Sequence, residues 1–217
     1  MTDLQMVVFD CDGVIVDSER MTNEVIRDDL ALHGLDLTVE DLMDRFVGGT
    51  MTNVRKQAID LGAKLGPDWV EEIYIKMYAR LGEAFELIPG IVSVLDALDA
   101  AGVPFAMGSN GRIAKMEVTL GRTGLLDRFE GRLLSGQDFP APKPAPDVYL
   151  GAMALVDAHP AKCAVVEDSA TGARAGRASG ARVFGFHAET PREKLAPHCD
   201  VLFDDMNDLP TLLGLSS

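Results

Sequence analysis

Basic residues are scarce in this chain of 217 residues. Lys and Arg together number 20 against 34 Asp and Glu, which gives a formal net charge of −14. A protein that binds a phosphate backbone needs clustered Lys and Arg, so this composition excludes nucleic acid as a partner and disfavours an anionic membrane surface. A small phosphorylated molecule is compatible with the charge, because it meets a local site rather than the whole surface.

Long apolar runs and cysteines are also few. No apolar run approaches the roughly 18 residues of a membrane span, and the first residues have neither the basic flank nor the apolar stretch of a signal peptide. The three cysteines, Cys11, Cys163 and Cys199, are odd in number and widely spaced, so they predict neither a metal site nor a disulfide framework. We therefore expect a protein of the reducing cytoplasm, with no membrane partner.

Short apolar runs that alternate with helical stretches make up much of the chain. Hydrophobic residues contribute 47% of the sequence, enough for a sizeable core. Six runs predict strands: Leu4–Phe9, Val103–Met107, Arg132–Leu134, Cys163–Val166, Arg182–Phe186 and Val201–Phe203. Four helices are expected between them: Ile91–Ala101, Ile113–Leu120, Pro146–Val156 and Ala170–Ala178. This alternation predicts an α/β fold with a parallel sheet, whose active site lies at the carboxyl ends of the strands.

One spacing in the chain is anomalous. A strand–helix–strand unit takes roughly 30 residues, yet more than ninety residues separate Asp10 from Val103. The excess predicts four helices: Ser18–Leu32, Thr38–Phe46, Thr52–Leu65 and Asp68–Phe85. We therefore expect an all-helical domain over residues 16–86, inserted into a core made of residues 1–15 and 87–217.

Two acidic residues follow the first expected strand. Asp10 and Asp12 lie in Phe9-Asp10-Cys11-Asp12-Gly13. A calcium loop that began at Asp10 would need Gly at position six and Glu at position twelve, but Gly13 is position four and Met21 is position twelve. The calcium loop is therefore rejected. A solvated polar turn is the structural alternative to a catalytic pair.

Three further polar groups follow other expected strands. Ser109 and Asn110 open a helix, where a hydroxyl and free backbone N–H groups suit phosphate, although an ordinary helix cap is the alternative. Lys143 is held between two prolines, and is otherwise a solvated loop lysine. Glu167 and Asp168 end an apolar strand; they suit a divalent ion, or are solvated turn acids. Because each group lies at a different strand end, all are expected to converge on one crevice.

These four groups, taken in order, resemble the motifs of the haloacid dehalogenase superfamily, in the branch that contains phosphoglycolate phosphatase and β-phosphoglucomutase. The resemblance covers essentially the whole chain, and residues 16–86 stand where that branch carries its helical cap. It implies a Rossmann-like parallel-sheet core with a cap that closes as a substrate-selecting lid. It further implies a Mg²⁺-dependent phosphatase that acts on a small phosphorylated metabolite, either a sugar phosphate or a sugar-acid phosphate.

The resemblance also implies a role for each core residue. Asp10 is the nucleophile that forms an aspartyl-phosphate, and Asp12 is the general acid and base. Mg²⁺ is held by the Asp10 carboxylate, the Asp12 backbone carbonyl and the Asp168 carboxylate, with Glu167 bound to it directly or through water. Three residues hold the phosphate oxygens: Ser109, Asn110 through its backbone amide, and Lys143.

The cap loop and two basic side chains are weaker candidates for substrate binding. They are Gly48, Gly49, Thr50, Arg55 and Lys76, and a solvated helix surface is the alternative for the two basic residues. β-Phosphoglucomutases carry an Arg where this chain has Met51, and a His where it has Thr22. Both departures count against the nearest alternative, a phosphomutase. A signalling or non-catalytic phosphate-binding domain is a more distant alternative, and we expect a monomer because the cap must move.

Overall fold

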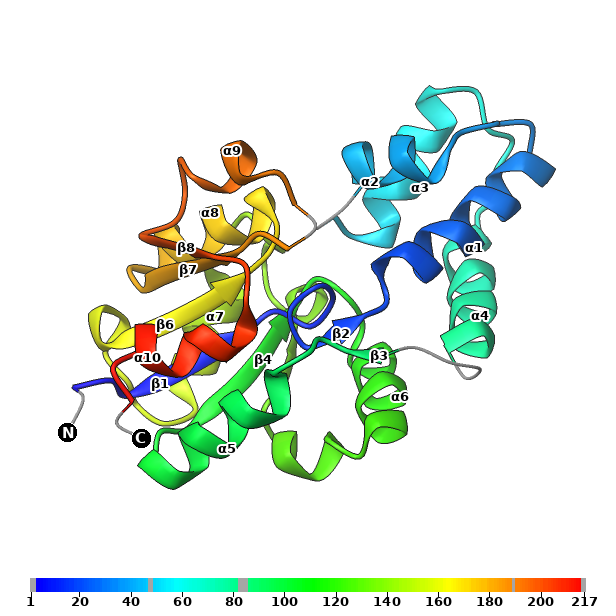
Figure 1. Ribbon diagram of the computed structural model, residues 1–217. Helices are drawn as coiled ribbons and strands as arrows, with labels where there is room; N and C mark the ends of the chain where they lie inside the picture. The colour runs from blue at the N-terminus through cyan, green and yellow to red at the C-terminus, as the bar shows by residue number, and fades with distance from the viewer. Residues whose placement is uncertain (1–2, 47–48, 82–85, 189, 216–217) are drawn as a thin grey trace.

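A six-stranded parallel sheet forms the centre of the molecule (Figure 1). The computed structural model describes residues 3–46, 49–81, 86–188 and 190–215. The strand order is β5-β4-β1-β6-β7-β8. The strands are β1 (Met6–Phe9), β4 (Phe105–Ser109), β5 (Leu133–Ser135), β6 (Cys163–Glu167), β7 (Arg182–Phe186) and β8 (Val201–Phe203). All six lie where the sequence predicts them, so the expected α/β fold is confirmed.

Helices cover both faces of this sheet because the side chains of each strand alternate between the faces. Val7 and Phe9 of β1 belong to an apolar cluster with α5 and α6, whereas Met6 and Val8 pack in a second cluster with α7 and α8. These helices are α5 (Ile91–Ala101), α6 (Ile113–Thr123), α7 (Asp147–Ala154) and α8 (Ala170–Ser179). Short helices complete the core: η1 (Leu126–Phe129), η2 (Gly136–Asp138), η3 (Pro160–Lys162), α9 (Arg192–Leu195), η4 (Met206–Asp208) and α10 (Leu209–Leu212).

Four helices between β1 and α5 form a separate unit, which we call the helical insert. They are α1 (Glu19–Leu32), α2 (Val39–Phe46), α3 (Met51–Asp60) and α4 (Trp69–Leu81). The insert has its own apolar cluster, which includes Leu42, Trp69 and Ile73. Thr38 and Asp41 form an acidic variant of the capping box before α2: each side chain accepts a hydrogen bond of 3.0 Å from the backbone N–H of the other.

A short antiparallel ribbon joins the insert to the core. It pairs β2 (Val16–Asp17) with β3 (Glu86–Leu87), and neither strand was expected from the sequence because two residues show no periodicity. The expected helix Thr52–Leu65 was too long, since α3 ends at Asp60 and Gly62 adopts a φ of +107° in the turn that follows. In the part of the chain that is described, no helix has the length and apolar character to cross a bilayer.

The buried cluster of the insert generates a stability prediction. Leu42 is 0% exposed, whereas Leu32 at the end of α1 is 81% exposed. We expect Leu42→Ala to lower the free energy of unfolding by about 2–5 kcal/mol, because it removes buried methyl groups and leaves a cavity. Leu32→Ala changes the same residue type and is expected to stay within about 0.5 kcal/mol of the parent. Chemical denaturation checks both, and equal losses would contradict the assigned packing.

Candidate active site

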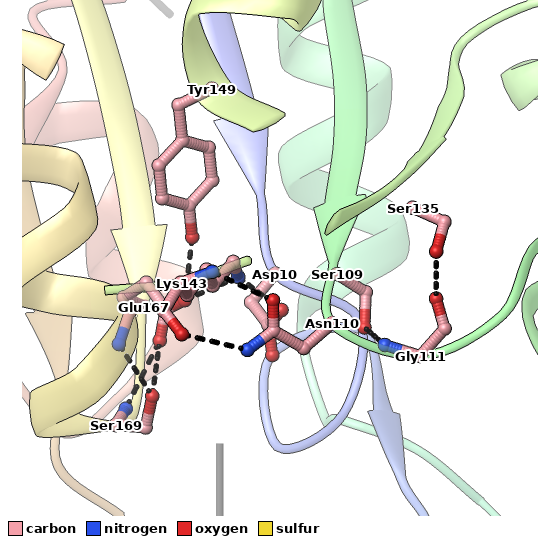
Figure 2. Close-up of polar contacts among 10 residues, drawn as sticks. Asp10, Ser109, Asn110, Gly111, Ser135, Lys143, Tyr149, Glu167 and Ser169 are labelled. Carbon is pink, nitrogen blue, oxygen red and sulfur yellow. Dashed lines mark hydrogen bonds and ion pairs between the residues drawn. The ribbon is translucent and has the colours of Figure 1, made fainter. Parts of the chain in front are cut away.

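The carboxyl ends of four neighbouring strands bring the predicted core residues into one cleft. Asp10 follows β1, Ser109 ends β4, and Glu167 ends β6, so these side chains meet at the same edge of the sheet (Figure 2). Lys143 comes from the loop after β5 and reaches into the same cleft. The lining residues on the core side are Asp10, Asp12, Ser109, Asn110, Gly111, Lys115, Lys143, Glu167, Asp168 and Ser169.

The Lys143 ammonium lies between two carboxylates. Its Nζ donates to Asp10 Oδ1 and to Glu167 Oε1, both at 2.6 Å. It also lies 4.6 Å from the centroid of the Tyr149 ring, which adds a cation–π contact. Burial alone would lower the pKa of Lys143, but the two carboxylates outweigh it and raise the pKa. Lys143 is therefore a fixed positive charge next to Asp10.

Protein donors surround the Glu167 carboxylate. Oε1 accepts from Lys143 and from the Tyr149 hydroxyl at 2.5 Å, and Oε2 accepts from the Ser169 amide at 3.1 Å and the Ser169 hydroxyl at 2.9 Å (Figure 2). Helix α8 passes so close that a Cβ on Gly172 would lie 1.6 Å from Glu167 Oε1. These contacts hold the Glu167 carboxylate in place, and the carboxylate in turn positions the Lys143 ammonium.

The Asn110 side chain ties two loops together. Its Nδ2 donates to the Lys143 carbonyl at 3.2 Å, and its Oδ1 accepts from the Lys143 amide at 2.9 Å. The Asn110 carbonyl accepts from Gln137 Nε2 at 2.9 Å. Ser109 Oγ accepts from the Gly111 amide at 3.0 Å, which leaves its O–H to donate into the cleft. The side chain of Asn110 thus holds the lysine loop against the end of β4.

Asp10 and Asp12 have different electrostatic surroundings. Burial raises the pKa of Asp10 to about 7, although Lys143 opposes this shift. Burial would also raise the pKa of Asp12, but Lys115 and Ser18 outweigh it and lower the pKa. Lys115 Nζ donates to Asp12 Oδ1 at 2.6 Å, and the Ser18 hydroxyl donates to the same oxygen. The two aspartates are therefore held by different lysines.

A buried group of carboxylates has the composition of a cation site. Oxygens of Asp10, Glu167 and Asp168 lie within 4.8 Å of one another. Gly13 has a φ of +75°, and a Cβ there would lie 2.1 Å from Asp168 Oδ2, so glycine is needed for this loop to pack against Asp168. Oxygen ligands suit a hard divalent cation such as Mg²⁺. The Asp12 carboxylate lies outside this group of three and is paired with Lys115 instead.

The three candidates of the cap loop, Gly48, Gly49 and Thr50, differ in their relation to the cleft. Gly49 lines the cleft. Thr50 is the N-cap residue of α3, and its side chain accepts from the Asn53 amide at 3.3 Å. Gly48 lies outside the described residues.

The two basic candidates of the insert contact other parts of the insert. Arg55 Nε donates to the Gly66 carbonyl at 2.9 Å, and Lys76 Nζ pairs with Asp29 at 3.1 Å. Neither residue lines the cleft. The insert contributes mainly apolar side chains to the cleft: Ile26, Phe46, Met51, Val54 and Met77. Its polar contribution is Thr22, Asn23 and Tyr74.

Polar contacts join the insert to the core beside the cleft. Arg112, just before α6, pairs with Glu71 of α4 at 2.6 Å and stacks over the Tyr74 ring with its guanidinium 4.2 Å from the centroid. Gln137 Nε2 donates to the Tyr74 hydroxyl at 3.2 Å and also to the Asn110 carbonyl. Tyr74 is thus connected through a single side chain to the loop that bears Ser109 and Asn110.

Sequence reasoning missed Lys115, Tyr149 and Ser169 as members of the site. Lys115 is one helical turn from Thr119, which is buried, so the periodicity of α6 could have placed the lysine on the inner face. Tyr149 stands in an apolar helix that the sequence explains by packing alone. Ser169 is a helix cap whose hydroxyl both accepts from the Gly172 amide and donates to Glu167.

This fold and site define a haloacid dehalogenase-like hydrolase. The model of that family matches residues 4–180, and the chain belongs to the family. It is 31% identical over 215 residues to 6-phosphogluconate phosphatase of Escherichia coli K12, with 98% of this chain and 96% of that protein covered. Its relatives mark it as a phosphoric monoester hydrolase.

Two solved structures share the whole fold. A conserved haloacid dehalogenase-like protein from Agrobacterium tumefaciens superimposes with a TM-score of 0.81 at 30% identity, covering 97% of this chain and 98% of its own. A family hydrolase from Deinococcus radiodurans, solved with bound phosphate and sodium, gives 0.79 at 28% identity, covering 100% of this chain and 99% of its own. The expected family and its Rossmann-like core are therefore confirmed.

The close approach of α8 to Glu167 generates a prediction for activity. A methyl group in Gly172→Ala must displace the Glu167 carboxylate and with it the Lys143 ammonium. We expect kcat/KM for p-nitrophenyl phosphate to fall by about 100-fold or more, the size seen when one transition-state donor is removed. Gly66→Ala is the matched control, because, its chain neighbours aside, no atom of the described residues lies within 4 Å of the added Cβ. Parent-like activity in Gly172→Ala would refute this role of Glu167.

Proposed function

We propose that this protein is a Mg²⁺-dependent phosphatase that forms an aspartyl-phosphate on Asp10. The observation that carries this proposal is the Lys143 ammonium, 2.6 Å from Asp10 Oδ1 and buried in the same cleft as Ser109. A carboxylate is a competent nucleophile for phosphoryl transfer. Its attack on a phosphate dianion is opposed by charge, at a cost of about 4 kcal/mol for two unit charges 4 Å apart at an effective dielectric of 20.

The residues of the cleft counter this repulsion. Lys143, the Ser109 hydroxyl and the Asn110 backbone amide would each take a non-bridging phosphate oxygen, which orients phosphorus in front of Asp10. Asn110 keeps Lys143 in place through its two hydrogen bonds to the lysine backbone. Positioning and charge compensation then allow the Asp10 carboxylate to attack phosphorus.

Asp12 would act as the general acid in the first step and as the general base in the second. In its protonated form it donates a proton to the leaving oxygen when Asp10 attacks. Ionised by that step, it accepts a proton from the water that hydrolyses the aspartyl-phosphate, which restores the protonated form. The ionised Asp12 beside Lys115 corresponds to the form that accepts a proton. Ser18 and Lys115 hold one oxygen of the carboxylate, so that Asp12 faces the cleft in a fixed orientation.

The metal ligands we propose are the carboxylates of Asp10 and Asp168 and the backbone carbonyl of Asp12, with Glu167 acting from a greater distance. Glu167 already accepts four hydrogen bonds from the protein, which favours contact with the cation through water. When bound, Mg²⁺ supplies positive charge that neutralises the phosphate and the acidic cluster.

Residues 16–86 would act as a lid over a core of residues 1–15 and 87–217. The contacts of Arg112 with Glu71 and of Gln137 with Tyr74 support a closed arrangement in which the insert covers the cleft. Closure would exclude water from the transfer step. Among the described residues, the insert lines the cleft around Met51 without a basic side chain, and this departure from the phosphomutase pattern disfavours a phosphomutase.

The substrate we propose is a small sugar phosphate or sugar-acid phosphate. The support comes from the 6-phosphogluconate phosphatase that is similar over nearly the whole chain. A panel of phosphorylated metabolites, with released inorganic phosphate as the readout, would identify the preferred compound. β-Glucose 1-phosphate belongs in the panel, because its conversion to the 6-phosphate would reveal mutase activity.

The role of Asp10 generates a direct prediction. Asp10→Asn removes the nucleophilic oxygen while keeping the shape of the side chain, so Mg²⁺-dependent hydrolysis of p-nitrophenyl phosphate should fall more than about 1,000-fold. The parent protein should also gain the mass of one phosphoryl group on Asp10 after rapid acid quenching. Asp127→Asn, at an exposed position on η1, is the control and should keep parent activity. Survival of hydrolysis in Asp10→Asn would overturn the mechanism.

A further inference from the structure

Lys115 is a buried cation that the proposed chemistry uses only as a support for Asp12. It lies on α6, is 5% exposed, and lines the cleft. Asp12 is its hydrogen-bond partner within the described part of the chain, so two of its three N–H donors are left for a ligand. Burying an ammonium costs free energy that its hydrogen bonds must offset, so the two remaining donors favour a ligand that accepts from them.

The cleft holds few positive charges. Among its described lining residues only Lys115 and Lys143 are basic, and Lys143 is already shared by Asp10 and Glu167. Lys115 is bound to one carboxylate only. It is therefore the cation that can accept a second anionic group of the substrate, beside the phosphate. The described residues of the insert that line the cleft are mainly apolar, and none of them is basic.

The position of Lys115 limits where that anionic group can be. Asp12 must reach the ester oxygen in order to protonate it, and Lys115 Nζ lies 2.6 Å from Asp12 Oδ1. Because Lys115 and Ser18 occupy Oδ1, Oδ2 faces the ester oxygen, and the ammonium lies within a short distance of that oxygen, across a single carboxylate. This distance fits a carboxylate a few carbons from the phosphoester, on the alcohol that leaves.

A second observation indicates a polar ligand in the same cleft. Thr22 Oγ1 is buried, lines the cleft, and has no hydrogen-bond partner among the residues that the structure describes. A buried hydroxyl without a partner costs free energy, and a ligand hydroxyl would satisfy it. An acidic polyol would therefore offer a partner both to Lys115 and to the hydroxyl of Thr22.

We propose that Lys115 is a specificity-determining residue that binds a carboxylate of the leaving alcohol close to the phosphoester. The enzyme would then prefer phosphates of short hydroxy acids to phosphates of the corresponding polyols. This inference rests on the proposed phosphatase activity, and it names the substrate class for that activity.

The test compares substrates that differ in one group. The pairs are glycerate 3-phosphate with glycerol 3-phosphate, erythronate 4-phosphate with erythritol 4-phosphate, and gluconate 6-phosphate with glucitol 6-phosphate. In each pair a carboxylate replaces a CH₂OH group. We expect kcat/KM of the parent to favour the acid by about 10- to 100-fold in the three- or four-carbon pair, the size of one charge-assisted hydrogen bond. Lys115→Met should lower kcat for both members of a pair, because it removes the support of Asp12, and it should bring the ratio close to one through a further loss in kcat/KM for the acid.

Two further variants keep the outcome interpretable. Lys115→Arg retains the charge and should retain a preference for the acid. Lys162→Met removes a lysine that pairs with Asp3 at 3.0 Å, far from the cleft lining, and should leave the ratio unchanged.

Three outcomes would overturn the assignment of Lys115. They are equal losses for acid and polyol in Lys115→Met, no preference for the acid in the parent, and a Lys115-dependent preference confined to the six-carbon pair. Failure of the parent to hydrolyse any phosphate, including p-nitrophenyl phosphate, would instead refute the proposed function.

Discussion

The site depends on one ammonium group that two carboxylates share. Lys143 comes from the loop after β5, yet it contacts Asp10 at the end of β1 and Glu167 at the end of β6. Loss of one partner would leave a buried charge without compensation, which typically costs about 3–5 kcal/mol. The Asn110 side chain, the Tyr149 ring and the close passage of α8 are all arranged around this contact. The end of the sheet is therefore organised electrostatically before any substrate binds.

The two walls of the cleft differ in chemistry. The core wall carries the charges, which come from strand ends, the loops that follow them and helix α6. The wall of the insert is largely apolar, and its two basic candidates, Arg55 and Lys76, contact the insert itself. A substrate would therefore be recognised by charge on one side and by shape on the other. Both lysines that line the described cleft therefore belong to the core.

The sequence predicts what is local or follows from the topology of a parallel sheet. Asp10, Ser109, Lys143 and Asp168 meet because strand ends in such a sheet share one edge. Other features depend on how distant elements pack: the Lys115–Asp12 pair joins residues 103 positions apart, and its existence requires the exact rotation of α6 against the sheet. The ribbon of β2 and β3 was missed because its strands are too short to show a pattern. Domain boundaries at residues 16 and 86 remain a prediction.

The ribbon has a consequence for how this molecule could have acquired its insert. Val16 pairs with Leu87, so the chain departs from the core and rejoins it at neighbouring points. An insertion of any length between two positions that lie side by side does not change the order of the strands in the sheet. The core can thus keep its catalytic geometry while the segment above it is exchanged. A change of the insert would therefore require new chain connections only at the β2–β3 ribbon.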